Sequence, residues 1–322
     1  MKTRLITGII LIGILVPLVL IEELFLPLQI VFILFALVGS HEMLKLYSKE
    51  RKFSWKIKIV AMFSTVLIYS AILNFWSGNR SNENMTFAPN LNQFISWGPN
   101  VGLAMVILAV LLQLSLLVFS QSFDGKDIGK TLSTSIYIGF GVSSIMMLRL
   151  MGVRFIVYLF LITIMTDVFA YVFGMLFGKH KMIERISPKK TWEGAVGGTV
   201  MATVVAGLFA LLYGSLFENE PITIFHLFSK QANGEFVDFP QYLKVILIFG
   251  VTLCASIVSQ VGDLVASRLK RTYDVKDFGN IFPGHGGFLD RFDSAILTAM
   301  FLLMVFLIIN EVFGATILMG IF

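Results

Sequence analysis

Residues 101–120 of the chain read VGLAMVILAVLLQLSLLVFS. This stretch carries no charged side chain over a length that can cross the hydrocarbon core of a bilayer as an α-helix. Similar apolar runs lie at residues 5–21, 25–42, 57–76, 131–151, 153–178, 195–217, 242–267 and 295–314. None of them alternates with period two as a membrane-spanning strand would. The sequence therefore predicts an all-α, polytopic integral membrane protein with about nine transmembrane helices.

The composition agrees with a protein embedded in lipid. Hydrophobic residues make up 57% of the chain and charged residues only 14%. A water-soluble fold could not bury so much apolar surface, so lipid is the expected solvent. The net charge of +5 is typical of a membrane protein whose inside loops collect Lys and Arg, and we expect no nucleic-acid partner. The single cysteine excludes an internal disulfide, and the four histidines lack the spacing of a zinc motif.

The distribution of basic residues predicts the orientation of the spans. With the N-terminus inside, 20 of the 25 Lys and Arg residues fall in inside segments, which predicts an N-inside, C-outside topology. The run 5–21 lacks a small-x-small cleavage pattern, so we interpret it as a retained first helix. We expect four N-terminal spans in residues 1–130 and a catalytic region of five spans in residues 131–322, with inside loops at 179–194 and 268–294.

Polar side chains concentrate in residues 163–194 and 256–294. Asp167 is the single acidic residue of the apolar run 153–178. The run 242–267 carries a polar stripe at helical spacing, formed by Ser256, Ser259, Gln260, Asp263 and Ser267. A carboxylate that faces lipid is costly, so both aspartates should face a cavity or a partner, and intramembrane acids are functional by default. A structural ion pair is the alternative for Asp263, and close helix packing is the favoured interpretation of the glycines near Asp167.

The inside loop ISPKKTWEG at residues 186–194 carries candidate phosphate ligands. Lys189 and Lys190 can bind phosphate oxygens as point charges, and the hydroxyls of Ser187 and Thr191 can donate hydrogen bonds to them. A basic loop that only orients the protein in the membrane is the alternative.

The most polar stretch is KDFGNIFPGHGGFLDRFDS at residues 276–294. Its proline and glycines predict a loop that exposes backbone N–H groups. Asp290 and Asp293 follow where the last helix is expected to begin, and their i, i+3 spacing places both carboxylates on one face. Helix capping is one interpretation of these acids. Acids beside Arg291 also suit Mg²⁺ with a polyphosphate, because magnesium combines one or two carboxylates with substrate phosphates and water.

Residues 267–293, SRLKRTYDVKDFGNIFPGHGGFLDRFD, resemble the signature of CDP-diacylglycerol synthases, also called phosphatidate cytidylyltransferases. The stretch SPKKTWEG at 187–194 and the residues Asp167, Tyr171 and Gly174 are also similar to that family, so the resemblance covers roughly residues 160–300. It implies an enzyme that makes CDP-diacylglycerol and pyrophosphate from CTP and phosphatidate in the membrane. It also implies Mg²⁺ and, as in at least some members, a second cation such as K⁺.

The resemblance implies that Asp263 and Asp290 are the metal ligands. We expect Asp293 and Asp167 to support them. The expected catalytic residues are Asp263, Asp290, Asp293, Lys270, Arg271, Arg291 and His285. The expected substrate-binding residues are Ser187, Lys189, Lys190, Thr191, Ser267, Lys276, Asp277, Gly286, Gly287 and Asp167. His285 is expected to orient a phosphate or to transfer a proton; a turn residue bonded to backbone is the alternative.

Two other functions fit a many-helix membrane body with intramembrane acids. A CTP-dependent lipid or polyprenol kinase would transfer the γ-phosphate and release CDP. An ion-coupled transporter would use Asp167 and Asp263 as coupling groups, but the sequence shows no repeated halves. CTP is soluble and phosphatidate keeps its head group at the interface, so we expect an active site on the cytoplasmic side of a bacterial inner membrane. The family's similarity to known dimers makes a homodimer one option.

Overall fold

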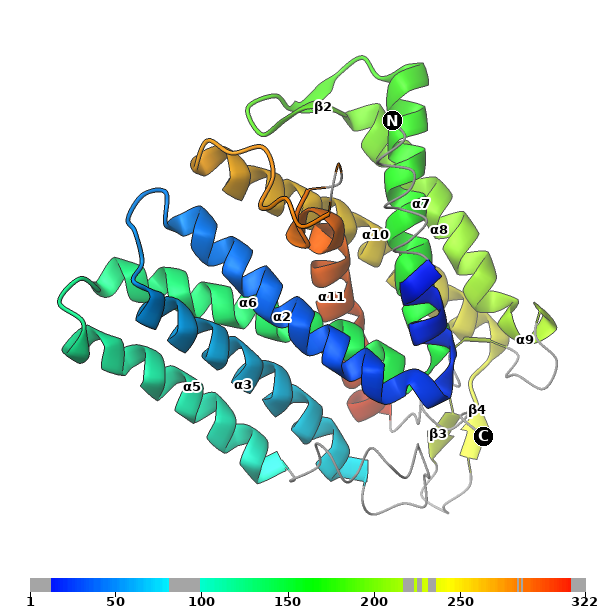
Figure 1. Cartoon of the computed structure of the whole chain (residues 1–322). Helices are drawn as coiled ribbons and strands as arrows, with labels where there is room; N and C mark the ends of the chain where they lie inside the picture. Colours follow the sequence, from blue (N-terminus) through cyan, green and yellow to red (C-terminus); the bar gives the residue numbers. More distant parts are fainter. Residues whose placement is uncertain are drawn as a thin grey trace. The chain divides into compact units, whose positions relative to one another are not determined.

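The computed structural model describes residues 13–80, 99–216, 223–224, 228–230, 236–282, 284 and 286–313. Within these residues, eight helices are long and apolar enough to cross a membrane. They are α2 (Phe25–Tyr47), α3 (Trp55–Arg80), α5 (Pro99–Phe119), α6 (Gly125–Met151), α7 (Val153–Phe177), α8 (Trp192–Leu211), α10 (Gln241–Thr272) and α11 (Leu289–Phe313) (Figure 1). The predicted all-α, polytopic membrane fold is confirmed. Residues 5–12 of the predicted first span, 5–21, lie outside the described residues, and the exact number and orientation of spans stay predictions.

The other elements in the described residues are short. A 3₁₀ turn η1 (Glu22–Leu24) precedes α2, and α9 (Tyr213–Leu216) follows α8. Two antiparallel hairpins pair β1 (Lys181–Ile183) with β2 (Ser187–Thr191) and β3 (Phe228–Lys230) with β4 (Phe236–Asp238). The stretch SPKKT, expected as part of a loop, thus forms the second strand of a two-stranded hairpin, where a proline is tolerated because neither strand is central.

Helix α10 is longer than the apolar run that predicted it. Its 32 residues correspond to about 48 Å of helix, which exceeds the roughly 30 Å of a hydrocarbon core. The basic residues Lys270 and Arg271 occupy its last turn, where cations also interact favourably with the helix dipole. The polar end of α10 is therefore long enough to leave the hydrocarbon region.

The chain forms two compact units. Unit 1 comprises Met1–Met147 and Leu269–Phe292, and unit 2 comprises Leu148–Arg268 and Asp293–Phe322. Unit 1 therefore combines the early helices with the glycine-rich loop of the sequence signature. Unit 2 contains the β1–β2 hairpin, Asp167 and Asp263. The functional division proposed at residues 130 and 131 stays a prediction.

Buried hydroxyl and amide groups link the helices of unit 1. The Gln113 side chain on α5 donates to Ser135 Oγ on α6 over 2.8 Å, and that hydroxyl donates to the Ala61 carbonyl on α3 over 3.1 Å. Ser64 on α3 donates to the Ala109 carbonyl on α5 over 3.2 Å. In a lipid solvent such bonds hold helices together where apolar contacts alone give little specificity.

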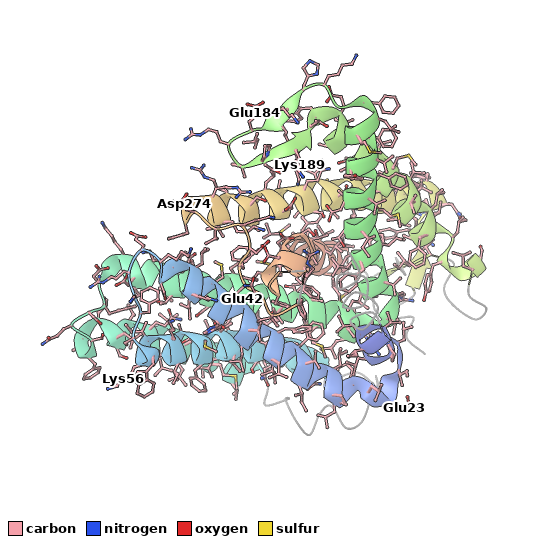
Figure 2. The ribbon with its side chains drawn as sticks, turned by 45° about the horizontal axis from the view of Figure 1, so that its top comes forward. Glu23, Glu42, Lys56, Glu184, Lys189 and Asp274 are labelled. Atoms are coloured by element: carbon pink, nitrogen blue, oxygen red, sulfur yellow. The ribbon has the colours of Figure 1, made fainter. Side chains whose placement is uncertain are left out.

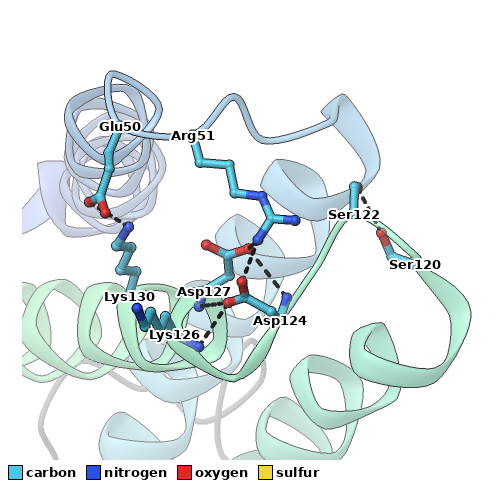
Figure 3. A network of polar contacts seen from close by, with 8 residues as sticks. All are labelled: Glu50, Arg51, Ser120, Ser122, Asp124, Lys126, Asp127 and Lys130. Atoms are coloured by element: carbon cyan, nitrogen blue, oxygen red, sulfur yellow. Dashed lines mark hydrogen bonds and ion pairs between the residues drawn. The ribbon is translucent and has the colours of Figure 1, made fainter.

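An ionic network joins the α2–α3 turn of unit 1 to the start of α6 (Figure 3). Arg51 Nη1 lies 2.5 Å from Asp124 Oδ2 and 3.0 Å from Asp127 Oδ2. Lys130 Nζ lies 2.8 Å from Glu50 Oε2. The backbone N–H of Asp127 and then that of Lys126 hold the pKa of the Asp124 carboxyl below its ordinary value. The network therefore fixes the spacing between two turns that are far apart in the sequence.

Replacement of Arg51 by alanine is expected to destabilise the protein without acting on chemistry. The side chain of Asp127 is 2% exposed, so the change leaves a buried carboxylate without its cation. Such a loss costs about 1–3 kcal/mol of unfolding free energy. Thermal unfolding in detergent should show a lower midpoint. Lys126→Ala is the matched control, because Lys126 contributes its backbone N–H to the network in Figure 3 and alanine keeps that group. An equal fall of the unfolding midpoint in both variants would contradict the stabilising role of the Arg51 side chain.

Candidate active site

Four predicted site residues of unit 2 come together from three elements. The Lys190 ammonium on β2 forms an ion pair with Asp263 Oδ2 on α10. The Ser267 hydroxyl, one turn further along α10, lies 3.5 Å from Asp263 Oδ1. Asp167 on α7 interacts electrostatically with both Asp263 and Lys190. Asp263 is therefore an intramembrane acid with a basic partner and a second carboxylate nearby.

The hairpin and the start of α8 position Lys190. Thr191 caps α8, because its Oγ1 accepts the N–H of Gly194 over 3.2 Å. Glu193 accepts the backbone N–H groups of Lys179 and His180, each over 3.2 Å. Successive side chains of a strand point to opposite faces, so Lys190 reaches Asp263 whereas Lys189 is exposed on the hairpin (Figure 2). Lys189 is thus available to a soluble anion.

Close packing between α7 and α8 brings the hairpin toward Asp167. A Cβ on Gly194 would lie 2.6 Å from the carbonyl oxygen of Ala170 on α7. A Cβ on Gly174 would lie 3.1 Å from Thr191 Oγ1. The backbone of α8 can therefore approach α7 only where side chains are absent, which supports the structural interpretation of these glycines.

Part of the polar stripe on α10 joins helices. Thr166 Oγ1 on α7 lies 2.7 Å from Ser256 Oγ, and Gln260 Nε2 donates to Thr199 Oγ1 on α8 over 2.7 Å. Ser259 is fully buried. The stripe thus fixes α7 and α8 against α10 through its first residues, and Asp263 with Ser267 forms its charged end.

In unit 1, Asp290 in the first turn of α11 organises the glycine-rich loop. Its Oδ1 accepts a hydrogen bond from Lys270 Nζ over 2.8 Å. Its Oδ2 accepts the N–H of Phe278 over 2.8 Å and that of Gly287 over 2.9 Å. The side chain is 3% exposed. A carboxylate offers about four acceptor positions, and described residues use three of them.

The remaining predicted residues occupy simpler surroundings. Asp293 is buried in α11, where its Oδ1 accepts the N–H of Ser294 over 2.8 Å. Gly286 adopts a positive φ of 84°, and Ser187 is half-buried. Exposed polar groups that a soluble substrate can reach are Arg271, Lys276, Asp277 and Arg291. His285 lies outside the described residues.

The carboxylates can be compared with the needs of magnesium. Among the described residues, no three His, Cys, Asp or Glu side chains gather into a candidate metal cluster. Magnesium needs only one or two carboxylates when substrate phosphates and water complete its shell. The interaction of Asp167 with Asp263 supplies such a pair, with Lys190 as its present counter-charge. The assignment of Asp263 and Asp290 as metal ligands stays a prediction.

Sequence reasoning missed Glu42. This residue lies on α2 and is 2% exposed, and its carboxylate accepts backbone N–H groups of the glycine-rich loop. The predicted span ended at residue 42, so Glu42 fell at its boundary and was not considered as a site residue. The available signal was the continuing apolar sequence Met43-Leu44, which makes Glu42 an acid inside a longer helix.

The fold is that of a polytopic membrane protein, and each of these two clusters pairs a carboxylate with a lysine. Residues 2–309 match the sequence profile described as the cytidylyltransferase family. The chain belongs to this family.

Named relatives give the same result. The phosphatidate cytidylyltransferase of Bacillus subtilis is 32% identical over 306 residues, which are 94% of this chain and 96% of that protein. The phosphatidate cytidylyltransferases of Staphylococcus haemolyticus and Staphylococcus aureus are 40% and 39% identical over 199 residues. These matches cover 62% of this chain and 66% of each staphylococcal protein, just under two thirds of their length.

Proposed function

We propose that this chain is a phosphatidate cytidylyltransferase, which converts CTP and phosphatidate to CDP-diacylglycerol and pyrophosphate. The observation that carries the proposal is the ion pair between Lys190 and Asp263, with Asp167 beside it. These residues are distant in the sequence. Asp167 and Asp263 were predicted as acids within apolar runs, and Lys190 was predicted as a phosphate ligand. The proposed substrates are taken from the name of the relatives, phosphatidate cytidylyltransferase.

In the proposed reaction, an oxygen of the lipid phosphate attacks the α-phosphorus of CTP. A new P–O bond forms while the bond to the β-phosphate breaks, and pyrophosphate leaves with the electron pair. Both reactants are anions, so the chain must neutralise charge and hold them in line. Lys190 and Lys270 supply positive charge beside the carboxylates of Asp263 and Asp290, and Lys189 adds an exposed charge on the hairpin. No side-chain nucleophile is needed, and electrostatic stabilisation accounts for most of the catalysis.

Magnesium is part of the proposal. Asp263 would hold it with Asp167 in support, and Asp290 would be a further carboxylate ligand with Asp293 in support. When bound, the ion neutralises phosphate charge and polarises the P–O bonds. The role of Lys190 is to balance Asp263 and to receive phosphate oxygens as the substrate arrives. A second cation, such as K⁺, belongs to the same proposal.

We place the active site on the cytoplasmic side of a bacterial inner membrane. The lysines and arginines of the β1–β2 hairpin and of residues 268–291 favour the inside face, and CTP is a soluble, cytosolic substrate. Phosphatidate would enter from the surrounding lipid. A homodimer is compatible with this arrangement and is tested by the mass of the purified protein in detergent.

The deciding assay uses the purified protein in vesicles that contain phosphatidate, with CTP labelled in its α-phosphate. We expect the label in a lipid product and release of pyrophosphate, both dependent on Mg²⁺ and lost with EDTA. A lipid kinase would instead release labelled CDP and phosphorylate an added alcohol. Movement of solute across the vesicles without any cytidine-labelled lipid would favour a transporter and contradict the proposal.

A further inference from the structure

A buried acid on α2 caps the last helix of the sequence signature. Glu42 Oε1 accepts the N–H of Phe288 over 3.0 Å, and Oε2 accepts the N–H of Leu289 over 2.9 Å. Figure 2 shows Glu42 on α2 beside the start of α11. The first N–H groups of a helix lack partners within the helix, and a carboxylate there also interacts favourably with the helix dipole.

The loop closes tightly around this carboxylate. A Cβ added to Gly279 would lie 2.3 Å from Glu42 Oε1, and one added to Gly287 would also lie 2.3 Å from it. Real Cβ atoms do not approach an oxygen so closely, so a side chain at either position would force the Glu42 carboxylate to shift. The ring of Phe288, stacked 4.7 Å from that of Phe35 on α2, fixes the same turn.

Glu42 and Asp290 share one run of backbone donors. The N–H of Gly287 goes to Asp290, and the next two, of Phe288 and Leu289, go to Glu42. The loop is therefore held between two carboxylates, one of which is the predicted catalytic Asp290. A shift of Glu42 would move the backbone that leads directly into Asp290, and with it the ion pair between Asp290 and Lys270.

We propose that Glu42 is a positioning residue for cytidylyl transfer, which fixes the backbone at residues 278–279 and 287–289 and thereby the orientation of Asp290 and Lys270. This inference rests on the proposed function. It also gives α2, which lies outside the residues 160–300 that carried the resemblance, a specific part in the active site.

The test compares Glu42→Ala and Glu42→Gln with the matched control Ser40→Ala. Ser40 is fully buried one half-turn away on the same helix, and its hydroxyl donates to the Ala36 carbonyl of that helix. A misplacement of about 1 Å can lower turnover about 100-fold, which is the loss expected for Glu42→Ala. Glu42→Gln keeps one acceptor oxygen and should lose less. Ser40→Ala should remain close to the wild-type rate.

Hydrogen exchange separates positioning from general destabilisation. In Glu42→Ala the amides of Phe288 and Leu289 should exchange faster while those of α3 and α5 stay protected. Faster exchange throughout these helices, or wild-type turnover in Glu42→Ala, would overturn the proposal. If Glu42→Ala fails to fold, Glu42→Gln supplies the same comparison. The exchange result is independent of catalysis, so an inactive wild-type protein would refute the proposed function without deciding the role of Glu42.

A second measurement tests the contact between Glu42 and Gly279. Gly279→Ala alone should be damaging, because its Cβ would meet the Glu42 carboxylate. In the Glu42→Ala background the same change should lower the unfolding midpoint much less, since the effects of substitutions at residues in contact are not additive. Additive effects on the unfolding midpoint would overturn the proposed arrangement of the loop.

Discussion

Asp290→Asn is expected to lower cytidylyl transfer about 1000-fold, in the range seen when a preorganised electrostatic group is lost. Asp290 is 3% exposed and accepts bonds from Lys270, Phe278 and Gly287. An amide cannot satisfy all three donors, because its nitrogen donates instead of accepting. The variant therefore loses a carboxylate at the predicted metal ligand and also disturbs the loop. Initial rates with saturating CTP and phosphatidate give the comparison.

Asp274→Asn is the matched control for this change. Asp274 is exposed, lies in the connection after α10, and has a positive φ of 51°, which asparagine tolerates well. It should leave the rate near that of the wild type. Turnover in Asp290→Asn equal to that of this control would refute the assignment of Asp290. Insertion into the membrane, measured in parallel, distinguishes lost chemistry from lost protein.

Hydropathy alone located the described membrane helices because lipid leaves a chain few options. Backbone groups in hydrocarbon must bond within the segment, so an apolar run of sufficient length becomes a helix. Run and helix differ mainly where polar residues continue the helix, as in the extension of α10 to Thr272. The SPKKT hairpin was not predicted, because pairing of short polar strands depends on what lies next to them and leaves little pattern in a sequence.

The candidate site was predictable in its members but not in its pairings. Helical spacing placed Asp263 on a polar face, and the loop sequence predicted Lys190 as a phosphate ligand. Nothing local indicated that these two residues form an ion pair, since a contact between distant segments depends on how α7 and α8 pack. Glu42 was missed for the same reason: its partners, Phe288 and Leu289, lie at the other end of the chain.

Substitutions of Lys190 and Asp263, which form an ion pair, are expected to change the affinity for Mg²⁺ in opposite directions. Asp263→Asn removes a carboxylate proposed to hold Mg²⁺, so the rate should fall about 1000-fold and Mg²⁺ binding should weaken. Lys190→Met removes a cation that competes with the metal for the same oxygen. Its rate should fall about 10- to 100-fold, because a positive charge at the phosphates is lost, while Mg²⁺ binds more tightly.

Calorimetric titration of the substrate-free protein with Mg²⁺ measures this difference without reference to activity. Glu184→Gln is the matched control, since Glu184 is exposed on the same hairpin (Figure 2); its titration should match the wild type. Weaker Mg²⁺ binding in Lys190→Met would mean that Lys190 helps to build the metal site. Unchanged binding in Asp263→Asn would mean that the ion is held elsewhere and that Asp263 serves only to place Lys190.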